Sequence, residues 1–309
     1  MTLTETPLTP DLFVYVGPNP SKADGVPIKR ISFWQDVWMR FKLNKLAMSG
    51  LIILIFIILM AAIGPSLAGY TYYETHLSLK NSPPSEQYWF GSDDLGRDVF
   101  TRTWYGARIS LFVGVSAALV DLFIGVIWGG TAALAGGKIN EIMMRIADVL
   151  YGIPYLLVVI LLMVVLGSGL IPIIIALTIT GWISMARIVR GQVMQLKNQE
   201  FVLAARALGA SFSRILFRHL IPNAMGPIIV TMTLTIPSAI FVEAFLSFLG
   251  LGVQAPIASW GTMANEGLSA MKYYPWRLFF PALFISLTIF GFNMVGDGLR
   301  DSLDPRLRK

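Results

Sequence analysis

Six long apolar stretches alternate with polar segments along the chain. Each approaches the roughly 20 residues that a helix needs to cross the hydrocarbon core of a membrane. The pattern therefore predicts an all-α polytopic membrane protein with six transmembrane helices. The expected spans are residues 46–68, 109–134, 147–166, 170–186, 224–249 and 278–295. Only residues 167–169 separate the third span from the fourth, which predicts a tight hairpin there.

Lysine and arginine are distributed unequally between the two sides of this expected bundle. Of 24 such residues, 18 fall in segments on one side, together with both termini. Cytoplasmic segments carry an excess of Lys and Arg. We therefore expect both termini to be cytoplasmic. The remaining basic residues, expected outside, are Lys80, Arg97, Arg102, Arg108, Lys272 and Arg277.

The polar segments complete the expected domain organisation. The first of them is rich in Pro, Thr and Asp, and the next has aromatic residues at helical spacing beside basic ones. In chain order, we expect a flexible cytoplasmic tail at 1–30, an interfacial amphipathic helix at 31–45, transmembrane helix 1 at 46–68, an extracellular segment at 69–108, a core domain with five transmembrane helices at 109–298 and a cytoplasmic tail at 299–309.

Composition narrows the range of functions. The chain is 55% hydrophobic and 14% charged, with a mean hydropathy of +0.66. A pI near 9.5 would indicate nucleic acid in a soluble protein, but here the basic residues serve to orient spans, so we expect no nucleic-acid partner. The chain has no cysteine, and its two histidines, His76 and His219, are far apart. We therefore expect no metal site.

Sequence motifs of catalysis are absent from the chain. It has no G-x-x-x-x-G-K-[ST] phosphate loop, no H-E-x-x-H motif and no nucleophile elbow. We therefore expect a chain that is not an enzyme. If ATP drives its activity, another polypeptide must bind the nucleotide.

Residues 199–223, between the fourth and fifth spans, are too charged to cross a bilayer. Arg206, Arg214 and Arg218 recur at multiples of four and predict a basic stripe on an amphipathic helix. Gly209 is expected to interrupt this helix and Pro222 to end it, giving two short pieces joined by a tight turn. The expected apolar side comprises Phe201, Ala205, Leu208, Phe212 and Ile215. Such a segment on the cytoplasmic side is suited to binding by a soluble partner.

Several motifs resemble those of one transporter family. Ala204 and Ala205, then Gly209 after three residues, then the run 219–222 after nine more, are similar to the EAA loop of ABC-type importer permeases. Four further segments resemble the C-type permease subunits of oligopeptide and dipeptide importers, particularly the oligopeptide subunits of Gram-positive bacteria. These segments are residues 89–108, 243–252, 259–261 and 296–308.

The resemblance implies a type I ABC importer permease fold in a bacterial plasma membrane. It implies that the chain forms half of a translocation pathway, as a heterodimer with a B-type permease subunit. Two cytoplasmic ATPases, an extracellular peptide-binding protein and a peptide substrate would be the other partners, besides membrane lipid. The chain would bind no cofactor, because the partner ATPases would use ATP and Mg.

The resemblance also implies roles for particular residues. The EAA loop would be the coupling helix that docks on the ATPase. Its glutamate position is occupied here by Leu203, and Glu200, one turn earlier, could partly substitute. The expected ATPase-coupling residues are Glu200, Ala204, Ala205, Arg206, Gly209, Arg214, Arg218 and Pro222.

Two further groups of residues are candidates for transport. Asp121 and Glu243 fall within spans, where carboxylates are costly unless they face protein or water. The sequence is compatible with two roles for these carboxylates, pore lining and structural hydrogen bonding. The polar segments expected outside would contact the binding protein or cap the pore. Candidates for this docking are Asp93, Asp94, Arg97, Asp98 and Trp260.

Other functions stay open at this stage. Dipeptides, nickel chelates and glutathione-like compounds are alternative substrates. A secondary transporter would need intramembrane carboxylates, for which Asp121 is the candidate. A channel or passive scaffold would not need the segment 199–223.

Overall fold

The computed structural model describes residues 32–303, in which helices predominate. The expectations for residues 1–30 and for 304–309 of the C-terminal tail fall outside this part. The helices are α1 (Phe33–Leu43), α2 (Lys45–Ile63), η2 (Gly64–Ser66), η3 (Leu77–Leu79), α3 (Val99–Ala135), α4 (Gly137–Tyr151), α5 (Tyr155–Leu166), α6 (Leu170–Leu196), α7 (Glu200–Ala207), α8 (Phe212–Arg214), the π-helix η4 (Ile215–Leu220), α9 (Ile221–Asn223), α10 (Met225–Phe248), α11 (Trp260–Leu268) and α12 (Trp276–Leu303).

Five of the described helices are long and apolar enough to cross a membrane: α2, α3, α6, α10 and α12. Several extend beyond the spans expected from hydropathy. The second expected span began at residue 109, but α3 begins at Val99; the fourth was expected to end at 186, but α6 continues to Leu196. Hydropathy marks only the apolar part of a helix, whereas backbone hydrogen bonding continues into its polar ends.

The third expected span, 147–166, is wrong as a single straight helix. The chain forms α4 and α5 instead, bent by 79° at the break between them. Pro154 precedes α5 and lacks the N–H that a continuous helix would need. The pair counts as a sixth span only if the two helices are taken together. The glycines at the next connection, Gly167 and Gly169, both have positive φ, and α6 begins directly after them.

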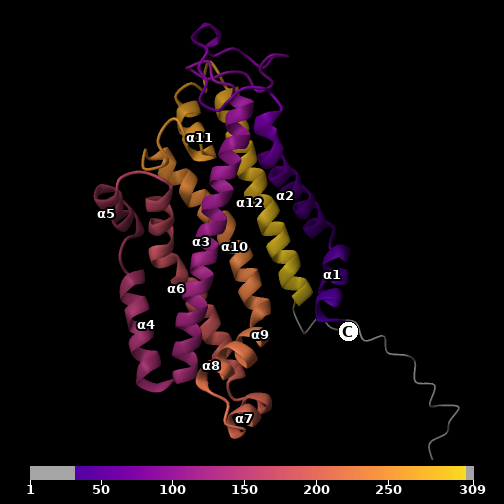
Figure 1. The fold of residues 1–309 in the computed structure, drawn as a ribbon, viewed down its shortest axis with the longest axis vertical. Coiled ribbons are helices and arrows are strands. Elements are labelled where there is room, and N and C mark those ends of the chain that lie inside the picture. Colours follow the sequence, from indigo (N-terminus) through magenta and orange to yellow (C-terminus); the bar gives the residue numbers. More distant parts are fainter. Residues whose placement is uncertain (1–31, 304–309) are drawn as a thin grey trace, which may run out of the picture. The chain divides into compact units, whose positions relative to one another are not determined.

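Helices α3, α6 and α10 form the centre of the bundle (Figure 1). Gly125 of α3 lies against Met185 of α6, and a Cβ added at Gly125 would lie 2.6 Å from the Met185 Cβ. One turn later, Gly129 meets the backbone of Ala186. Small residues at such positions allow helix backbones to approach closely. This close contact fixes α6 against α3.

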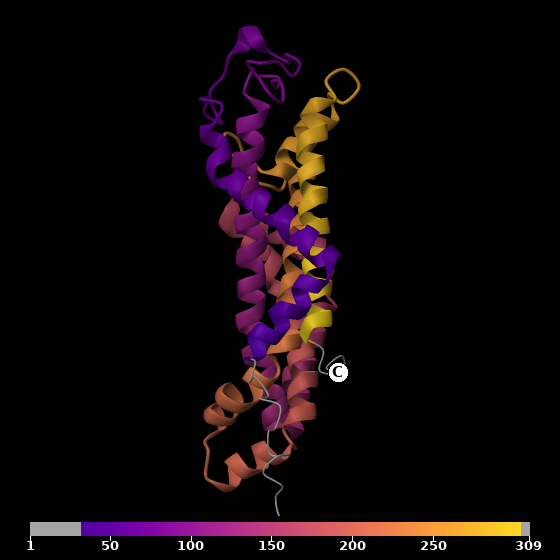
Figure 2. The same cartoon turned by 90° about the vertical axis from the view of Figure 1, so that its right-hand side faces the viewer.

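Helix α2 crosses α12 (Figure 2). A Cβ at Gly50 would lie 2.7 Å from the Met294 Cβ and 2.8 Å from the Gly291 carbonyl oxygen. Glycines at the crossing thus join the first long helix to the last. On α1, Val37 and Phe41 are buried while Trp38 is exposed, and the interfacial position expected for this helix stays a prediction.

The bundle has two distinct ends in Figures 1 and 2. One carries residues 64–98 and α11, and we call it the α11 end. The other carries α7 to α9, and we call it the α7 end. Both ends hold charged side chains, but they hold them in different ways.

Candidate functional site

The segment 199–223 at the α7 end consists of two helical pieces, as the sequence predicts. The first piece, α7, ends in a Schellman motif: the Gly209 N–H donates to the Arg206 carbonyl and the Ala210 N–H to the Ala205 carbonyl, each at 3.0 Å. Gly209 has a φ of +77°, and no atom lies within 4 Å of a Cβ built there. Backbone conformation, rather than contact inside the chain, is therefore the reason for glycine at this position.

The expected helix stop at Pro222 is wrong. The second piece passes through α8, the π-helix η4 and α9 in succession, and α10 follows after Ala224. Pro222 lies in the first turn of α9, where a missing N–H is tolerated. The π-helix immediately before it alters the hydrogen-bond register, a common adjustment in helices at functional sites. The second piece therefore runs almost without interruption into a long helix of the bundle.

The buried face of this segment differs from the apolar side expected from its sequence. Ala205 and Ile215 are buried as expected, but Phe201, Leu208 and Phe212 are exposed. The turn at Gly209 and the π-helix change the angular spacing, so a single helical period does not continue across them. The residues that anchor the segment to α3, α6 and α10 are Val202, Ile215, Leu216 and Leu220.

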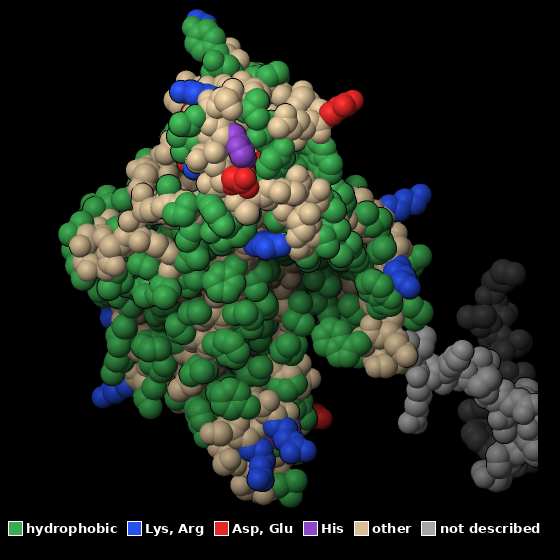
Figure 3. Space-filling model, turned by 45° about the horizontal axis from the view of Figure 1, so that its top comes forward, with side chains coloured by type: hydrophobic (Ala, Val, Ile, Leu, Met, Phe, Trp, Pro, Cys, Tyr) green, Lys and Arg blue, Asp and Glu red, His purple; other side chains and the backbone are tan. Residues whose placement is uncertain are grey.

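The outer face of the segment combines basic and apolar side chains. Arg206, Arg214 and Arg218 are exposed, and within residues 32–303 none of them forms an ion pair. Basic side chains gather at this tip in Figure 3. Leu208 is 89% exposed beside them. Other exposed members of the face are Glu200, Phe201, Leu203, Ala204, Gly209, Phe212, Phe217 and Pro222.

A cavity of about 450 Å³ opens between α3, α5, α6 and α10 in the middle of the bundle. Asp121 lines it, is only 4% exposed, and has an Oδ1 atom without a hydrogen-bond partner. A Cβ at Gly181 of α6 would overlap the Asp121 carboxylate, so glycine there makes room for the acid. The Tyr155 hydroxyl, also on the cavity wall, is likewise buried and without a partner.

Glu243, the other candidate for pore lining, does not line this cavity. It is fully buried, and its carboxylate accepts hydrogen bonds from Ser110 (3.1 Å) and Ser247 (2.8 Å). The Ser110 oxygen in turn accepts from the Trp260 N–H at 3.3 Å. Pore lining and structural hydrogen bonding were both possible roles for Glu243. In this structure its carboxylate forms hydrogen bonds that link α3, α10 and α11.

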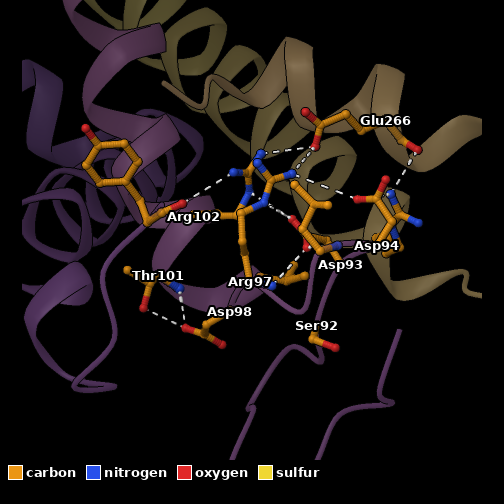
Figure 4. A network of polar contacts seen from close by, with 12 residues as sticks. Ser92, Asp93, Asp94, Arg97, Asp98, Thr101, Arg102 and Glu266 are labelled. Carbon is orange, nitrogen blue, oxygen red and sulfur yellow. Dashed lines mark hydrogen bonds and ion pairs between the residues drawn. The ribbon is translucent and has the colours of Figure 1, made fainter. Parts of the chain in front are cut away.

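A network of ion pairs ties the α11 end together (Figure 4). The Arg97 Nε donates to the Asp93 Oδ2 at 2.6 Å, and the Arg102 Nη2 lies 3.0 Å from the Glu266 Oε2. Arg277 on α12 lies 3.1 Å from the Asp94 Oδ1. The network thus joins the loop before α3 to α11 and α12. Carboxylates of Asp93, Asp94 and Glu266 come within 4.8 Å of one another, but arginines already occupy them, so these residues do not fit a cation.

Asp98 caps the first turn of α3 beside this network. Its Oδ2 accepts from the Thr101 N–H at 2.8 Å and from the Thr101 hydroxyl at 2.6 Å. Burial raises the pKa of the Asp98 carboxyl above its ordinary value, although these hydrogen bonds act in the opposite direction. The carboxylate therefore has a structural task at the start of the longest helix.

Burial argues against the docking contact expected for residues of this region. Asp93, Arg97 and Asp98 are 2–5% exposed and Trp260 is fully buried, with its Nε1 donating to the Thr103 carbonyl at 2.9 Å. Apart from the Asp98 Oδ1, their charged groups and the Trp260 indole N–H meet partners within the chain, and burial keeps these side chains from the surface in this structure. Asp94 alone among the five keeps a half-exposed side chain.

Two family models match this chain. Residues 121–309 match the binding-protein-dependent transport system inner membrane component, and residues 32–84 match the N-terminal TM domain of oligopeptide transport permease C. The chain belongs to this permease family. It is accordingly a multi-pass membrane protein of a bacterial ABC importer and a non-catalytic subunit, with ATP bound by partner subunits.

Individual relatives of this permease are similar over nearly their whole length. It is 64% identical over 299 residues to the oligopeptide transport system permease protein OppC of Bacillus subtilis, covering 97% of this chain and 98% of that protein. It is 63% identical to the dipeptide transport system permease protein DppC of the same organism, covering 93% and 90%. With OppC of Escherichia coli it shares 43%, covering 90% and 92%.

The solved structures support the fold of the permease. A structure of the MetNI methionine ABC transporter matches with a TM-score of 0.54 and 17% identity, covering 64% of this chain and 94% of that one. The prediction of an all-α protein with an ABC permease fold is therefore confirmed.

Several residues that organise the permease could not be predicted from sequence patterns. Glu266 and Arg277 join the ionic network from positions far along the chain, and neither stands in a recognisable pattern. For Tyr155 on the cavity wall, the sequence contains one indication: this residue directly follows the helix-breaking Pro154.

Proposed function

We propose that this permease forms half of the translocation pathway of an ATP-driven peptide importer. Peptide transport is named for the two relatives with 64% and 63% identity, one for oligopeptides and one for dipeptides. The other half of the pathway would be a B-type permease subunit. Two ATPases on the cytoplasmic side and an extracellular peptide-binding protein would complete the importer.

The proposed orientation has both termini in the cytoplasm. The positive-inside rule supports it, because the segments between expected spans at the α7 end are rich in Lys and Arg. The α7 end then faces the ATPases and the α11 end faces the binding protein. Since most of the docking candidates at the α11 end are buried, contact with the binding protein would use other residues there, such as the exposed Leu77 and Tyr73.

One observation carries the coupling role. The outer face of α7 to α9 presents unpaired arginines and exposed apolar side chains, while its inner face is anchored in the bundle by Val202, Leu216 and Leu220. An exposed apolar patch rimmed by polar groups marks an interaction surface. The anchored side would carry a displacement by the partner into α3, α6 and α10, which also line the cavity.

The mechanism that fits this arrangement is alternating access. ATP binding would close the ATPases and draw the two coupling segments together, which would open the paired permeases outward to receive a peptide. Hydrolysis and product release would restore the inward-open state. Asp121 would lie on the wall of the pathway, since it lines the central cavity.

Co-purification of the importer from detergent-solubilised membranes tests the coupling role. Leu208→Asp places a charge at a position that is 89% exposed at the α7 end, and Leu77→Asp places the same charge at a position that is 69% exposed at the α11 end. We expect mass spectrometry to find the second permease with both variants, but the ATPases only with Leu77→Asp. Retention of the ATPases by Leu208→Asp would count against docking at this surface.

Secondary transport is the competing function, because Asp121 is an intramembrane carboxylate beside a cavity. The purified importer, reconstituted in proteoliposomes with its binding protein, separates the two. Peptide uptake should require ATP on the side of the liposome membrane where the ATPases lie. An imposed proton or sodium gradient should not drive uptake. Uptake that is driven by a gradient without ATP would contradict ATP-driven import and support secondary transport.

A further inference from the structure

The side of the central cavity formed by α10 offers hydrogen-bond acceptors. Thr231, Thr235 and Ser238 of α10 line the cavity, and each donates its hydroxyl hydrogen to a carbonyl of its own helix, at 2.8, 2.9 and 3.1 Å. A hydroxyl whose hydrogen is engaged in this way retains oxygen lone pairs as acceptors. The α10 wall therefore offers acceptors to whatever enters the cavity.

Asp121 faces this wall from α3 with a carboxylate that lacks a counter-ion. It is 4% exposed, its Oδ1 has no hydrogen-bond partner, and Gly181 opposite leaves space for it. The described residues that line the cavity include no lysine, arginine or histidine. A buried carboxylate costs several kcal/mol unless it is paired. The cavity is thus complementary to a positively charged group with several hydrogen-bond donors.

A primary ammonium group has this chemistry, since it carries one positive charge and three donors. We propose that the cavity is a substrate subsite in which Asp121 binds the ammonium group of a peptide, with Tyr155 and the α10 hydroxyls as further polar contacts. This inference rests on the proposed import function and adds a specificity-determining residue to it. The cavity of about 450 Å³ lies within the size range of small-ligand pockets.

Equilibrium binding to the complete transporter without its binding protein tests the subsite directly. The purified complex in nanodiscs would be titrated with radiolabelled trialanine, and with N-acetyl-trialanine, which lacks the ammonium group. We expect the wild type to bind trialanine at least tenfold more tightly, because a charge-assisted hydrogen bond is lost on acetylation. Acetyl-Ala-Lys-Ala as a competitor then distinguishes a lysine side chain from the amino terminus as the source of the ammonium.

Variants assign the preference to Asp121. Asp121→Asn should weaken trialanine binding roughly tenfold or more and leave N-acetyl-trialanine binding unchanged. Tyr155→Phe should weaken it by a smaller factor, about three- to tenfold. Glu243→Gln is the matched control: it also converts a buried intramembrane acid to an amide, but outside the cavity. The free-amino preference should survive that change.

Several results would overturn the subsite. Three concern binding: equal binding of the two peptides by the wild type, absence of saturable trialanine binding, and unchanged preference in Asp121→Asn. Loss of the second permease from the Asp121→Asn complex would instead assign the carboxylate to subunit pairing, which also overturns the proposal. ATP-dependent peptide uptake by the same wild-type preparation would show that the import function stands independently of these outcomes.

Discussion

The two ends of the bundle use arginine in opposite ways. At the α11 end, Arg97, Arg102 and Arg277 are 2–7% exposed and each meets a carboxylate within 4 Å. At the α7 end, Arg206 and Arg214 are exposed, and the described residues offer neither an ion pair. Paired and buried arginines join helices within the chain, whereas exposed and unpaired ones leave their charge for another molecule. The residue type alone does not distinguish these tasks.

The largest effect is expected from removing a buried guanidinium. Arg102→Ala should destabilise the permease by about 2–5 kcal/mol, because it removes packed, buried side-chain volume and leaves Arg97 as the remaining guanidinium for Asp93 and Glu266. Thermal unfolding of the purified importer in nanodiscs would measure the loss. A cost below about 1 kcal/mol would mean that the network does not organise the α11 end.

The backbone turn at the α7 end should give the next effect. Gly209→Ala places a Cβ on a residue with a φ of +77°, which should cost about 1–2 kcal/mol through strain although the space there is open. Gly191→Ala in α6 is the matched control: it also has open space, but in a helix interior without positive φ. It should be neutral or stabilising, up to about 1 kcal/mol. Equal destabilisation by both would refute the turn argument.

The cap of α3 predicts a pH dependence at the α11 end. Asp98→Ala should cost about 1 kcal/mol near pH 4, where the contribution of Asp98 is largest, because the Thr101 N–H loses its acceptor. Asp98→Asn keeps a cap oxygen and removes the charge. Since burial raises the pKa of Asp98 in the folded chain, its contribution is most favourable below the ordinary pKa of about 4 and declines as the pH rises through the folded value.

Unfolding midpoints between pH 4 and 8 would measure this dependence. Wild type should lose stability relative to Asp98→Asn as the pH rises. A wild type that gains stability over the variant across the same range would show that the Thr101 hydrogen bonds outweigh burial.

The smallest effect on stability is expected on the exposed outer face of α7 to α9. Arg206→Ala should change the free energy of unfolding by no more than about 0.5 kcal/mol, since its side chain is exposed and without an ion pair in the described chain. The same variant should weaken ATPase binding, measurable by titrating the purified ATPase. Destabilisation comparable to that of Arg102→Ala would abolish the contrast between the two ends.

Hydropathy was sufficient to locate the long helices because a membrane span must satisfy its backbone internally over about 20 apolar residues. It could not mark where α3 begins, because Thr101 and Arg102 are polar residues in the first turn of a helix whose start is buried by its neighbours. Nor could it detect the 79° bend between α4 and α5, since the expected span 147–166 is largely apolar on both sides of the break. Pro154 was the local signal for that break.

The candidate sites were harder to predict, for a related reason. Charge in a polar loop normally indicates exposure, but Asp93 and Arg97 are buried as a pair, and Arg97 also meets Glu266, which lies 169 positions away in the chain. Glu243 and Asp121 look equivalent in sequence, and they differ because serines surround one and a cavity adjoins the other. Partners brought together by folding decide the role of each carboxylate.

Because α6 is a long unbroken helix, a small tilt at one point of it produces a larger displacement further along. Val193 lies beneath the coupling segment and Gly181 lies on the cavity wall of the same unbroken helix. Twelve residues of α-helix separate them, or about 18 Å. A tilt of about 10° about the Val193 contact would move the Gly181 turn by about 3 Å, close to the diameter of a water molecule. Under the proposed coupling, a small rotation of the α7 end would suffice to change what the cavity admits.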